Sequence, residues 1–151
     1  MALSAFFERI WWTSPPTTLA TLLSPAAWIF GRAVKLRREL YRGGTFKRSH
    51  PGVPVVVVGN IVVGGAGKTP VTQAVVRCLL QAGYKPGIIC RGYPVSPSTP
   101  RHVTARSRAS DVGDEPLLHF ALGVPVVVCA KRVLAANALL DRHPEVDVLV
   151  A

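Results

Sequence analysis

With 151 residues, 49% of them hydrophobic and 17% charged, the chain is long and apolar enough to bury the core of one domain, which excludes wholesale disorder. Its net charge of +10 favours anionic partners, namely nucleic acid, lipid headgroups or phosphorylated small molecules. The three cysteines are scattered and form no CxxC pair, which indicates a reducing compartment and no disulfide framework.

The first 50 residues hold a large share of the basic residues beside two apolar segments. Residues 3–13 are apolar and rich in aromatic side chains, and the pair Pro15-Pro16 follows them. Further on, Ser24 is the predicted N-cap of a helix, with Pro25 at its first position. Helical spacing then separates two faces. The apolar face holds Ile29, Ala33, Leu36 and Leu40, and the charged face holds Arg32, Lys35, Glu39 and Arg42.

Residues 1–50 are therefore predicted to be an amphipathic, basic, membrane-associating segment that ends in a glycine- and proline-rich linker. A transmembrane helix needs about 20 apolar residues, and the apolar run here is shorter and interrupted by Pro25. Such a helix would lie in the surface of a bilayer with its basic face among anionic headgroups. The alternative is a helix that packs on its own domain and exposes its basic face to water.

Residues 51–151 are predicted to form a separate α/β core. Val55–Val58 is so uniformly apolar that it predicts a central, parallel strand. A glycine-rich turn follows, and after it a helix from Lys68 to Ala82 that Gly83 closes.

Strands and helices then alternate around a predicted loop at residues 94–110. The predicted strands are 86–90, 125–129 and 146–151, and the predicted helices are 117–122 and 132–142. This alternation predicts a parallel sheet of the P-loop NTPase type with helices on both faces. Because the sequence ends on a buried-type strand, it is also predicted to be the N-terminal part of a longer protein.

The glycine-rich turn carries the main chemical signal. Its residues VVGGAGKT depart from the phosphate-loop pattern G-x-x-x-x-G-K-[ST] at the first position, which is valine. Between a buried strand and a helix, such a turn surrounds a polyphosphate with backbone N–H groups. The alternative is a glycine-rich turn with an incidental lysine. Lys68 is predicted to reach the β- and γ-phosphates, and Thr69 to place its hydroxyl on Mg²⁺. The predicted ATP-binding residues are Val62, Val63, Gly64, Gly65, Ala66, Gly67, Lys68 and Thr69.

Three linked motifs sharpen this prediction. GNIVVGGAGKTP at 59–70, CRGY at 90–93 and DVGDEP at 111–116, together with ERIWW near the N-terminus, resemble the tetraacyldisaccharide 4′-kinases of lipid A synthesis. The resemblance implies a P-loop kinase core, held peripherally or monotopically at the cytoplasmic face of a Gram-negative inner membrane. It further implies that ATP, with Mg²⁺, phosphorylates the 4′-hydroxyl of tetraacyldisaccharide 1-phosphate to give lipid IVA, a step of lipopolysaccharide biosynthesis.

The resemblance also assigns roles to single residues. Asp114 matches the aspartate that activates the acceptor hydroxyl, Glu115 lies beside it in the same site, and Lys68 completes the predicted catalytic set. A hydroxyl nucleophile needs such a carboxylate, although acidic residues also favour a helix N-terminus through its dipole alone. Arg91 is predicted either to contact phosphate or sugar oxygens or to pair with an acid. Tyr93 is a candidate contact of the same kind.

In the family that it resembles, the strand matching 146–151 continues with Asp-Asp-Gly-Leu-Gln-His, whose aspartates serve Mg²⁺. The sequence stops before that motif. Because phosphoryl transfer depends on the metal, residues 1–151 alone are predicted to have little or no activity.

Two other classes of function stay open. One is a membrane-associated P-loop ATPase switch of the GGxGKT type. Such proteins carry a second lysine early in the loop, where this chain has Val62 and Val63. The other is a basic nucleic-acid-binding module, for which the sequence offers no helix-turn-helix, zinc or base-stacking pattern. We therefore expect no nucleic-acid partner.

Overall fold

The computed structural model describes residues 18–46, 48–59 and 67–151, and it divides into two compact units, Met1–Arg48 and Ser49–Ala151. Two sequence predictions lie outside the described residues. They are the aromatic segment at residues 3–13 and the first five positions of the glycine loop, 62–66. From the sequence we expected the functional division after residue 50, which stays a prediction.

Two helices form the described part of the first unit, α2 (Thr18–Leu22) and α3 (Ser24–Arg42). The predicted amphipathic helix is confirmed, but the prediction of Ser24 as its N-cap is wrong. Leu23 holds the N-cap position with a helical backbone, and its carbonyl accepts the first bond from the N–H of Ala27 at 3.1 Å. Because α2 already delivers the chain in a helical conformation, Ser24 begins the helix and makes no side-chain cap.

None of the residues of α3 is buried. Its aromatic and aliphatic side chains are largely exposed, with 62% of Trp28 and 70% of Phe30 accessible to solvent. Two arginines lie over aromatic rings of the same helix: the guanidinium of Arg32 is 4.7 Å from the centre of Trp28, and that of Arg37 is 5.7 Å from Tyr41. In the described part of the chain, no helix has both the length and the hydropathy of a membrane span.

The second unit is built on a five-stranded sheet in the order β1-β5-β2-β4-β3. The strands are β1 (Val55–Val56), β2 (Pro86–Cys90), β3 (Arg101–His102), β4 (Val126–Val128) and β5 (Val148–Val150). All neighbours run parallel except β3, which pairs antiparallel with β4. The predicted α/β fold with a parallel sheet is therefore confirmed.

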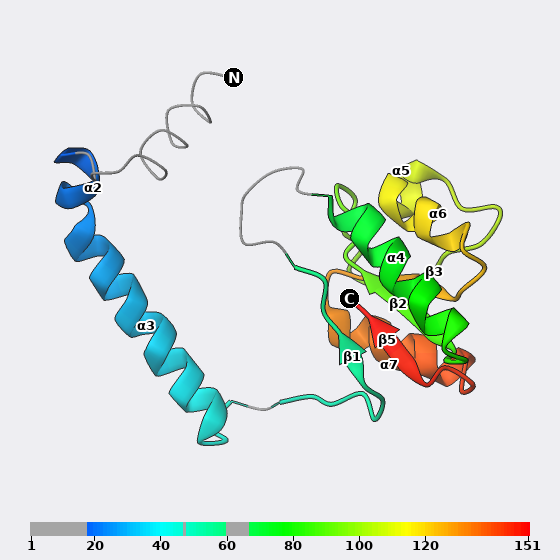
Figure 1. Cartoon of the computed structure of the whole chain (residues 1–151), viewed down its shortest axis with the longest axis horizontal. Helices are drawn as coiled ribbons and strands as arrows, with labels where there is room; N and C mark the ends of the chain where they lie inside the picture. Colours follow the sequence, from blue (N-terminus) through cyan, green and yellow to red (C-terminus); the bar gives the residue numbers. More distant parts are fainter. Residues whose placement is uncertain (1–17, 47, 60–66) are drawn as a thin grey trace. The chain divides into compact units, whose positions relative to one another are not determined.

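Helices cover both faces of the sheet. On one face lie α4 (Lys68–Gln81), α5 (Ala109–Val112) and α6 (Asp114–Phe120), and on the other lies α7 (Arg132–Arg142) (Figure 1). Since side chains alternate along a strand, β2, β4 and β5 each contribute residues to both cores. The buried residues under α4–α6 are Val76, Ile88, Val103, Val112, Val124, Val126, Val128 and Val150. Those under α7 are Ile89, Val127, Cys129, Ala135, Ala136, Leu139, Val146 and Leu149.

The prediction that Val55–Val58 is a central strand is wrong. β1 holds only Val55–Val56 and lies at the edge of the described sheet, where it pairs with β5 alone. Val56 and Val58 pack against the core under α4–α6, whereas 67% of Val57 is exposed. An apolar run predicts that both faces of a strand are apolar. It does not predict whether the strand has a neighbour on one side or on both sides.

The predicted loop at 94–110 also differs in part from the structure. It contains β3, whose two polar residues pair through backbone bonds, and the start of the short helix α5. In addition, α6 begins at Asp114, three residues before the predicted start, with Pro116 buried in its first turn. The predicted helix at 132–142 and the predicted strand at 86–90 are confirmed at both ends.

Candidate active site

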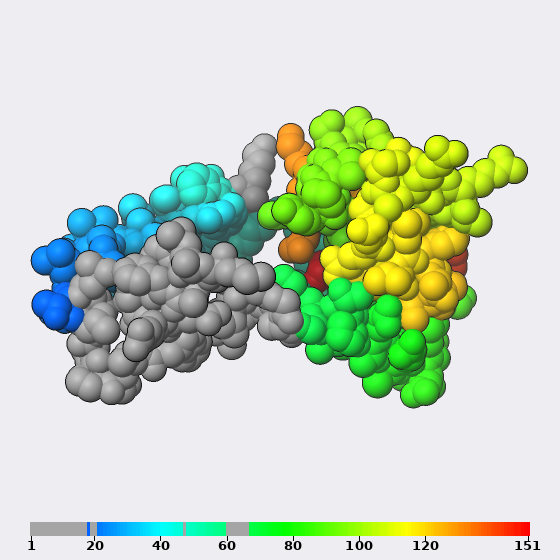
Figure 2. Space-filling model, turned by 90° about the horizontal axis from the view of Figure 1, so that it is seen from above, coloured from blue at the N-terminus to red at the C-terminus, as the bar shows by residue number. Residues whose placement is uncertain are grey.

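A cavity of about 140 Å³ lies where β2 and β5 end at their carboxyl edges and the chain leaves β1. Open α/β sheets bind their ligands at this edge. Parts of the chain far apart in sequence line the cavity: Val58, Lys68, Thr72, Ile88, Ile89, Cys90, Arg91, Gly92, Tyr93, Glu115, His119, Arg132, Val150 and Ala151. Figure 2 shows α4 in green beside α5 and α6 in yellow on the surface of this unit.

The N-terminus of α4 enters this site. Gly67 precedes the helix with φ 72° and ψ 27°, a left-handed conformation that glycine adopts without strain. The turn at Gly67 lets the helix begin at Lys68, which lines the cavity. Because the first N–H groups of a helix have no partner within it, this end of α4 attracts anions.

Two further glycines bring the segment after β2 against the start of α6. Gly92 and Gly113 both have positive φ, 69° and 89°. A Cβ on Gly113 would lie 2.6 Å from the carbonyl oxygen of Tyr93, and one on Gly92 would lie 2.7 Å from that of Val112. Only glycine permits this contact between backbones, and it places Arg91 and Glu115 around the same cavity.

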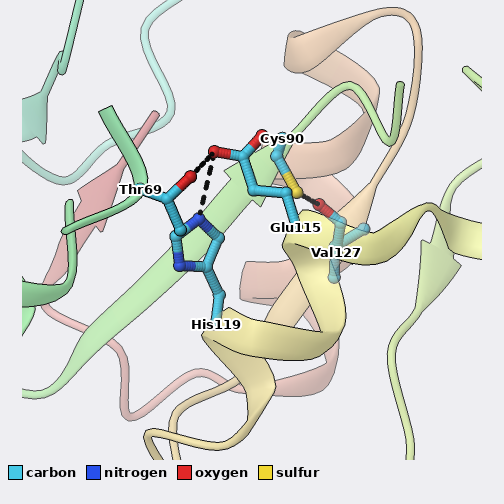
Figure 3. A network of polar contacts seen from close by, with 5 residues as sticks. All are labelled: Thr69, Cys90, Glu115, His119 and Val127. Atoms are coloured by element: carbon cyan, nitrogen blue, oxygen red, sulfur yellow. Dashed lines mark hydrogen bonds and ion pairs between the residues drawn. The ribbon is translucent and has the colours of Figure 1, made fainter. Parts of the chain in front are cut away.

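Thr69 and Glu115 meet in the site although they are 46 residues apart. The hydroxyl of Thr69 donates a hydrogen bond of 2.9 Å to Oε1 of Glu115 (Figure 3). A hydroxyl and a carboxylate side by side offer the hard oxygen ligands that Mg²⁺ takes. The residues present therefore fit a magnesium ion at the position predicted for Thr69.

His119 lies one helical turn beyond Glu115 and is only 2% exposed. Its Nε2 is 3.6 Å from Oε1 of Glu115, the same oxygen that accepts from Thr69, and its Nδ1 has no hydrogen-bond partner among the residues that the structure describes (Figure 3). Burial lowers the pKa of His119 below its ordinary value, although Glu115 acts in the opposite direction. Leaving a buried polar atom unpaired costs about 1–3 kcal/mol, so an apolar side chain would suit this position better for stability alone.

Cys90 ends β2 under the same carboxylate. Its thiol lies 4.0 Å from the carbonyl oxygen of Val127 (Figure 3). Burial, and after it the negative charge of Glu115, raises the pKa of Cys90 to about 12. The thiol therefore stays protonated at neutral pH, which argues against a nucleophilic role.

The charges around the cavity favour an anion. Lys68, Arg91 and Arg132 line it, and they face a single acidic side chain, Glu115. With His119 neutral at pH 7, the ionisable side chains of the lining carry a net positive charge. A polyphosphate would meet these cations and the N-terminus of α4 together.

The structure thus brings together five of the residues predicted for the site: Lys68, Thr69, Glu115, Arg91 and Tyr93. Gly67 is described just before them, and the loop positions 62–66 lie outside the described residues.

Asp114 lies beside Glu115 as the exposed first residue of α6 and is not among the residues that line the cavity. Its catalytic role stays a prediction. Sequence reasoning missed His119, Thr72 and Arg132. Helical spacing from Glu115 to His119 is the signal that could have found the histidine, and the position of Arg132 after a strand could have found the arginine.

Comparison with known proteins gives consistent matches. Residues 19–151 match the family model described as tetraacyldisaccharide-1-P 4′-kinase. The tetraacyldisaccharide 4′-kinase of Janthinobacterium sp. (strain Marseille) is 53% identical over 133 residues, which make up 87% of this chain and 38% of that protein. The protein of the same name from Herminiimonas arsenicoxydans is 47% identical over 150 residues, which make up 99% of this chain and 42% of that protein.

Among solved structures, the crystal structure of the "apo" form of LpxK from Aquifex aeolicus in complex with ATP matches with a TM-score of 0.69. The two chains are 27% identical, and the match covers 88% of this chain and 43% of the other. The chain thus spans well under half the length of the relatives that it matches.

Proposed function

Because the chain belongs to the tetraacyldisaccharide 4′-kinase family, we propose that it forms the nucleotide-binding part of a lipid A kinase. The whole protein transfers the γ-phosphate of ATP to the 4′-hydroxyl of tetraacyldisaccharide 1-phosphate. The observation that carries the proposal is the cavity at the carboxyl edge of the sheet, where Lys68 lies beside the bonded pair Thr69 and Glu115.

The described residues divide the work of phosphate binding. Lys68 and the N-terminus of α4 bind the phosphates of the nucleotide, with Arg132 adding positive charge to the same cavity. Thr69 and Glu115 would hold Mg²⁺, which, when bound, neutralises charge that develops on the phosphates during transfer. The similar Aquifex aeolicus protein was crystallised in complex with ATP, which supports this assignment.

The acceptor side of the site is assigned to the segment after β2 and the start of α6. Asp114 is exposed next to Glu115 and takes or orients the proton of the acceptor hydroxyl. Arg91 and Tyr93 line the cavity and are assigned to the phosphate or the sugar of the substrate.

The test is transfer of ³²P from the γ-position of ATP to tetraacyldisaccharide 1-phosphate by the full gene product. Replacing Lys68 with alanine removes a cation that contacts charge developing in the transition state, and we expect kcat/KM to fall by at least about a hundredfold. The control is Lys85→Ala, an exposed lysine just before β2, at the opposite edge of the sheet. Full activity of Lys68→Ala would overturn the assignment.

The same assay separates the second class of function. A P-loop ATPase switch hydrolyses ATP without the lipid acceptor, and its rate does not respond when the acceptor is added. A kinase shows the reverse, with little turnover until tetraacyldisaccharide 1-phosphate is present.

We also propose that the first unit attaches the enzyme to the anionic cytoplasmic surface of the inner membrane. Exposed aromatic side chains of α3, with Trp28 and Phe30 foremost, supply the apolar contact. A shallow depression on the same unit is lined by Arg37, Arg38, Arg42 and Arg48, together with Val34 and Tyr41. Its arginines concentrate positive charge at this surface. Arginine suits phosphate groups because its guanidinium donates two parallel hydrogen bonds.

A further inference from the structure

His119 is an unusual residue for the position that it occupies. Among the residues that the structure describes, only Thr72 and His119 are polar and buried. Thr72 lines the cavity as well, so both of these buried polar side chains lie at one site. A histidine that served only to fill space would gain nothing from an unpaired Nδ1.

The contacts of the ring decide which nitrogen carries the proton. A neutral imidazole has one N–H, and the partner that it faces sets its tautomer. Nε2 faces Oε1 of Glu115 at 3.6 Å, whereas Nδ1 has no partner within the described part of the chain. The proton therefore belongs on Nε2, where it points at a carboxylate.

Oε1 of Glu115 is then approached by two donors. His119 approaches from the core through Nε2–H, and Thr69 donates its hydroxyl hydrogen at 2.9 Å from the first turn of α4 (Figure 3). A threonine hydroxyl has only one hydrogen. Once Glu115 accepts it, the lone pairs of Thr69 are free for a cation.

We propose that His119 is a positioning residue that holds the carboxylate of Glu115 against Thr69 and so orients the Thr69 hydroxyl toward the divalent cation that accompanies the nucleotide. The proposal rests on the proposed function, since it needs a metal–nucleotide complex at this cavity. His119 does not touch the nucleotide. It acts through Glu115, as residues behind metal ligands commonly do.

The experiment measures the binding of a fluorescent ATP analogue to the full gene product while Mg²⁺ is titrated, with a parallel series in EDTA. Loss of an outer contact behind a metal ligand typically lowers metal affinity at least about tenfold. For His119→Leu we therefore expect the half-saturating Mg²⁺ concentration to rise by about tenfold, with nucleotide affinity in EDTA unchanged. His119→Gln, which can place an amide N–H near the position of Nε2, restores the wild-type Mg²⁺ dependence.

The chain offers a matched control. His143 contacts Glu145 at 3.1 Å in a histidine–glutamate pair that does not line the cavity, so His143→Leu leaves the Mg²⁺ dependence unchanged. If His119→Leu does not fold, His119→Asn provides the same comparison, because its amide reaches the position of Nδ1 and not that of Nε2.

Two outcomes would overturn the proposal. One is that His119→Leu has the same half-saturating Mg²⁺ concentration as the wild-type protein. The other is an equal shift in His119→Gln, which would show that only packing matters. Failure of the proposed function is distinguishable, because the wild-type protein itself would then show no Mg²⁺-dependent nucleotide binding.

Discussion

At the scale of single residues, the environment of each cysteine decides its reactivity. Cys78 is exposed on α4, Cys90 is half-buried at the end of β2, and Cys129 is buried with its thiol 3.4 Å from the carbonyl oxygen of Ser98. Since the thiolate is the reactive form, the pKa of about 12 at Cys90 predicts a nearly inert thiol inside the candidate site.

We therefore expect a thiol reagent at pH 8 to modify the native protein at Cys78 first. A thiol of pKa about 12 holds on the order of a thousandfold less thiolate at this pH than one of ordinary pKa. Mass spectrometry of the labelled protein gives the order of modification. Cys78→Ser should abolish the rapid phase, and rapid labelling of Cys90 in that variant would contradict the raised pKa.

The candidate site could be predicted from the sequence only in part, because single residues were predicted and the contacts between them were not. Lys68, Thr69 and Glu115 were predicted from local motifs, because the glycine turn and the DVGDEP segment are local in sequence. The contact between Thr69 and Glu115 is tertiary, because it joins α4 to α6 across 46 residues of sequence. Nothing in the sequence around His119 indicates that its Nδ1 would find no partner among the described residues.

At the scale of elements, the junction between the segment after β2 and the start of α6 is the point most sensitive to substitution. Gly113 has φ 89° and ψ 165°, a conformation that is essentially confined to glycine, and a Cβ there would press on the Tyr93 carbonyl. A side chain at Gly113 would therefore introduce strain where the two segments that carry Arg91 and Glu115 meet.

Gly113→Ala should lower the free energy of unfolding by about 1–3 kcal/mol from backbone strain, with a further loss from the contact at 2.6 Å. Gly123→Ala is the matched control, since Gly123 also has positive φ, 76°, but a Cβ there meets nothing within 4 Å. Urea denaturation compares the two. Equal destabilisation would show that the contact with Tyr93 is relaxed at little cost.

The elements also show how far patterns in the sequence can predict this fold. The apolar run 86–90 lies between turn residues and becomes β2 as predicted, and the spacing of 132–142 becomes α7. β3 could not be predicted, since Arg101 and His102 pair with β4 through backbone groups. β1 was predicted as a strand, but its place at the edge depends on β5, at the other end of the sequence.

At the scale of the whole molecule, we assign the basic residues of the first unit to the proposed binding of an anionic membrane. Removing two charges by Arg38→Gln with Arg42→Gln should weaken binding to vesicles that contain an anionic phospholipid by about thirtyfold, since each surface arginine contributes about 1 kcal/mol. Flotation of the full gene product measures this, with zwitterionic vesicles for comparison. Arg77→Gln with Arg106→Gln removes two exposed arginines of the second unit as the control, and an equal loss there would contradict the role of α3.

The order of the strands also has a consequence for synthesis of the protein. Among the described strands, β1 pairs only with β5, through Val55 with Leu149 and Val56 with Val150, and the N–H of Val58 donates to Ala151 at 2.8 Å. Joining such distant parts of the chain costs entropy before any contact compensates for it. During translation, β1 leaves the ribosome long before its partner strand exists. β1 is therefore fixed in the sheet only after β5 has emerged, and we expect the cavity where these two strands end to form only then.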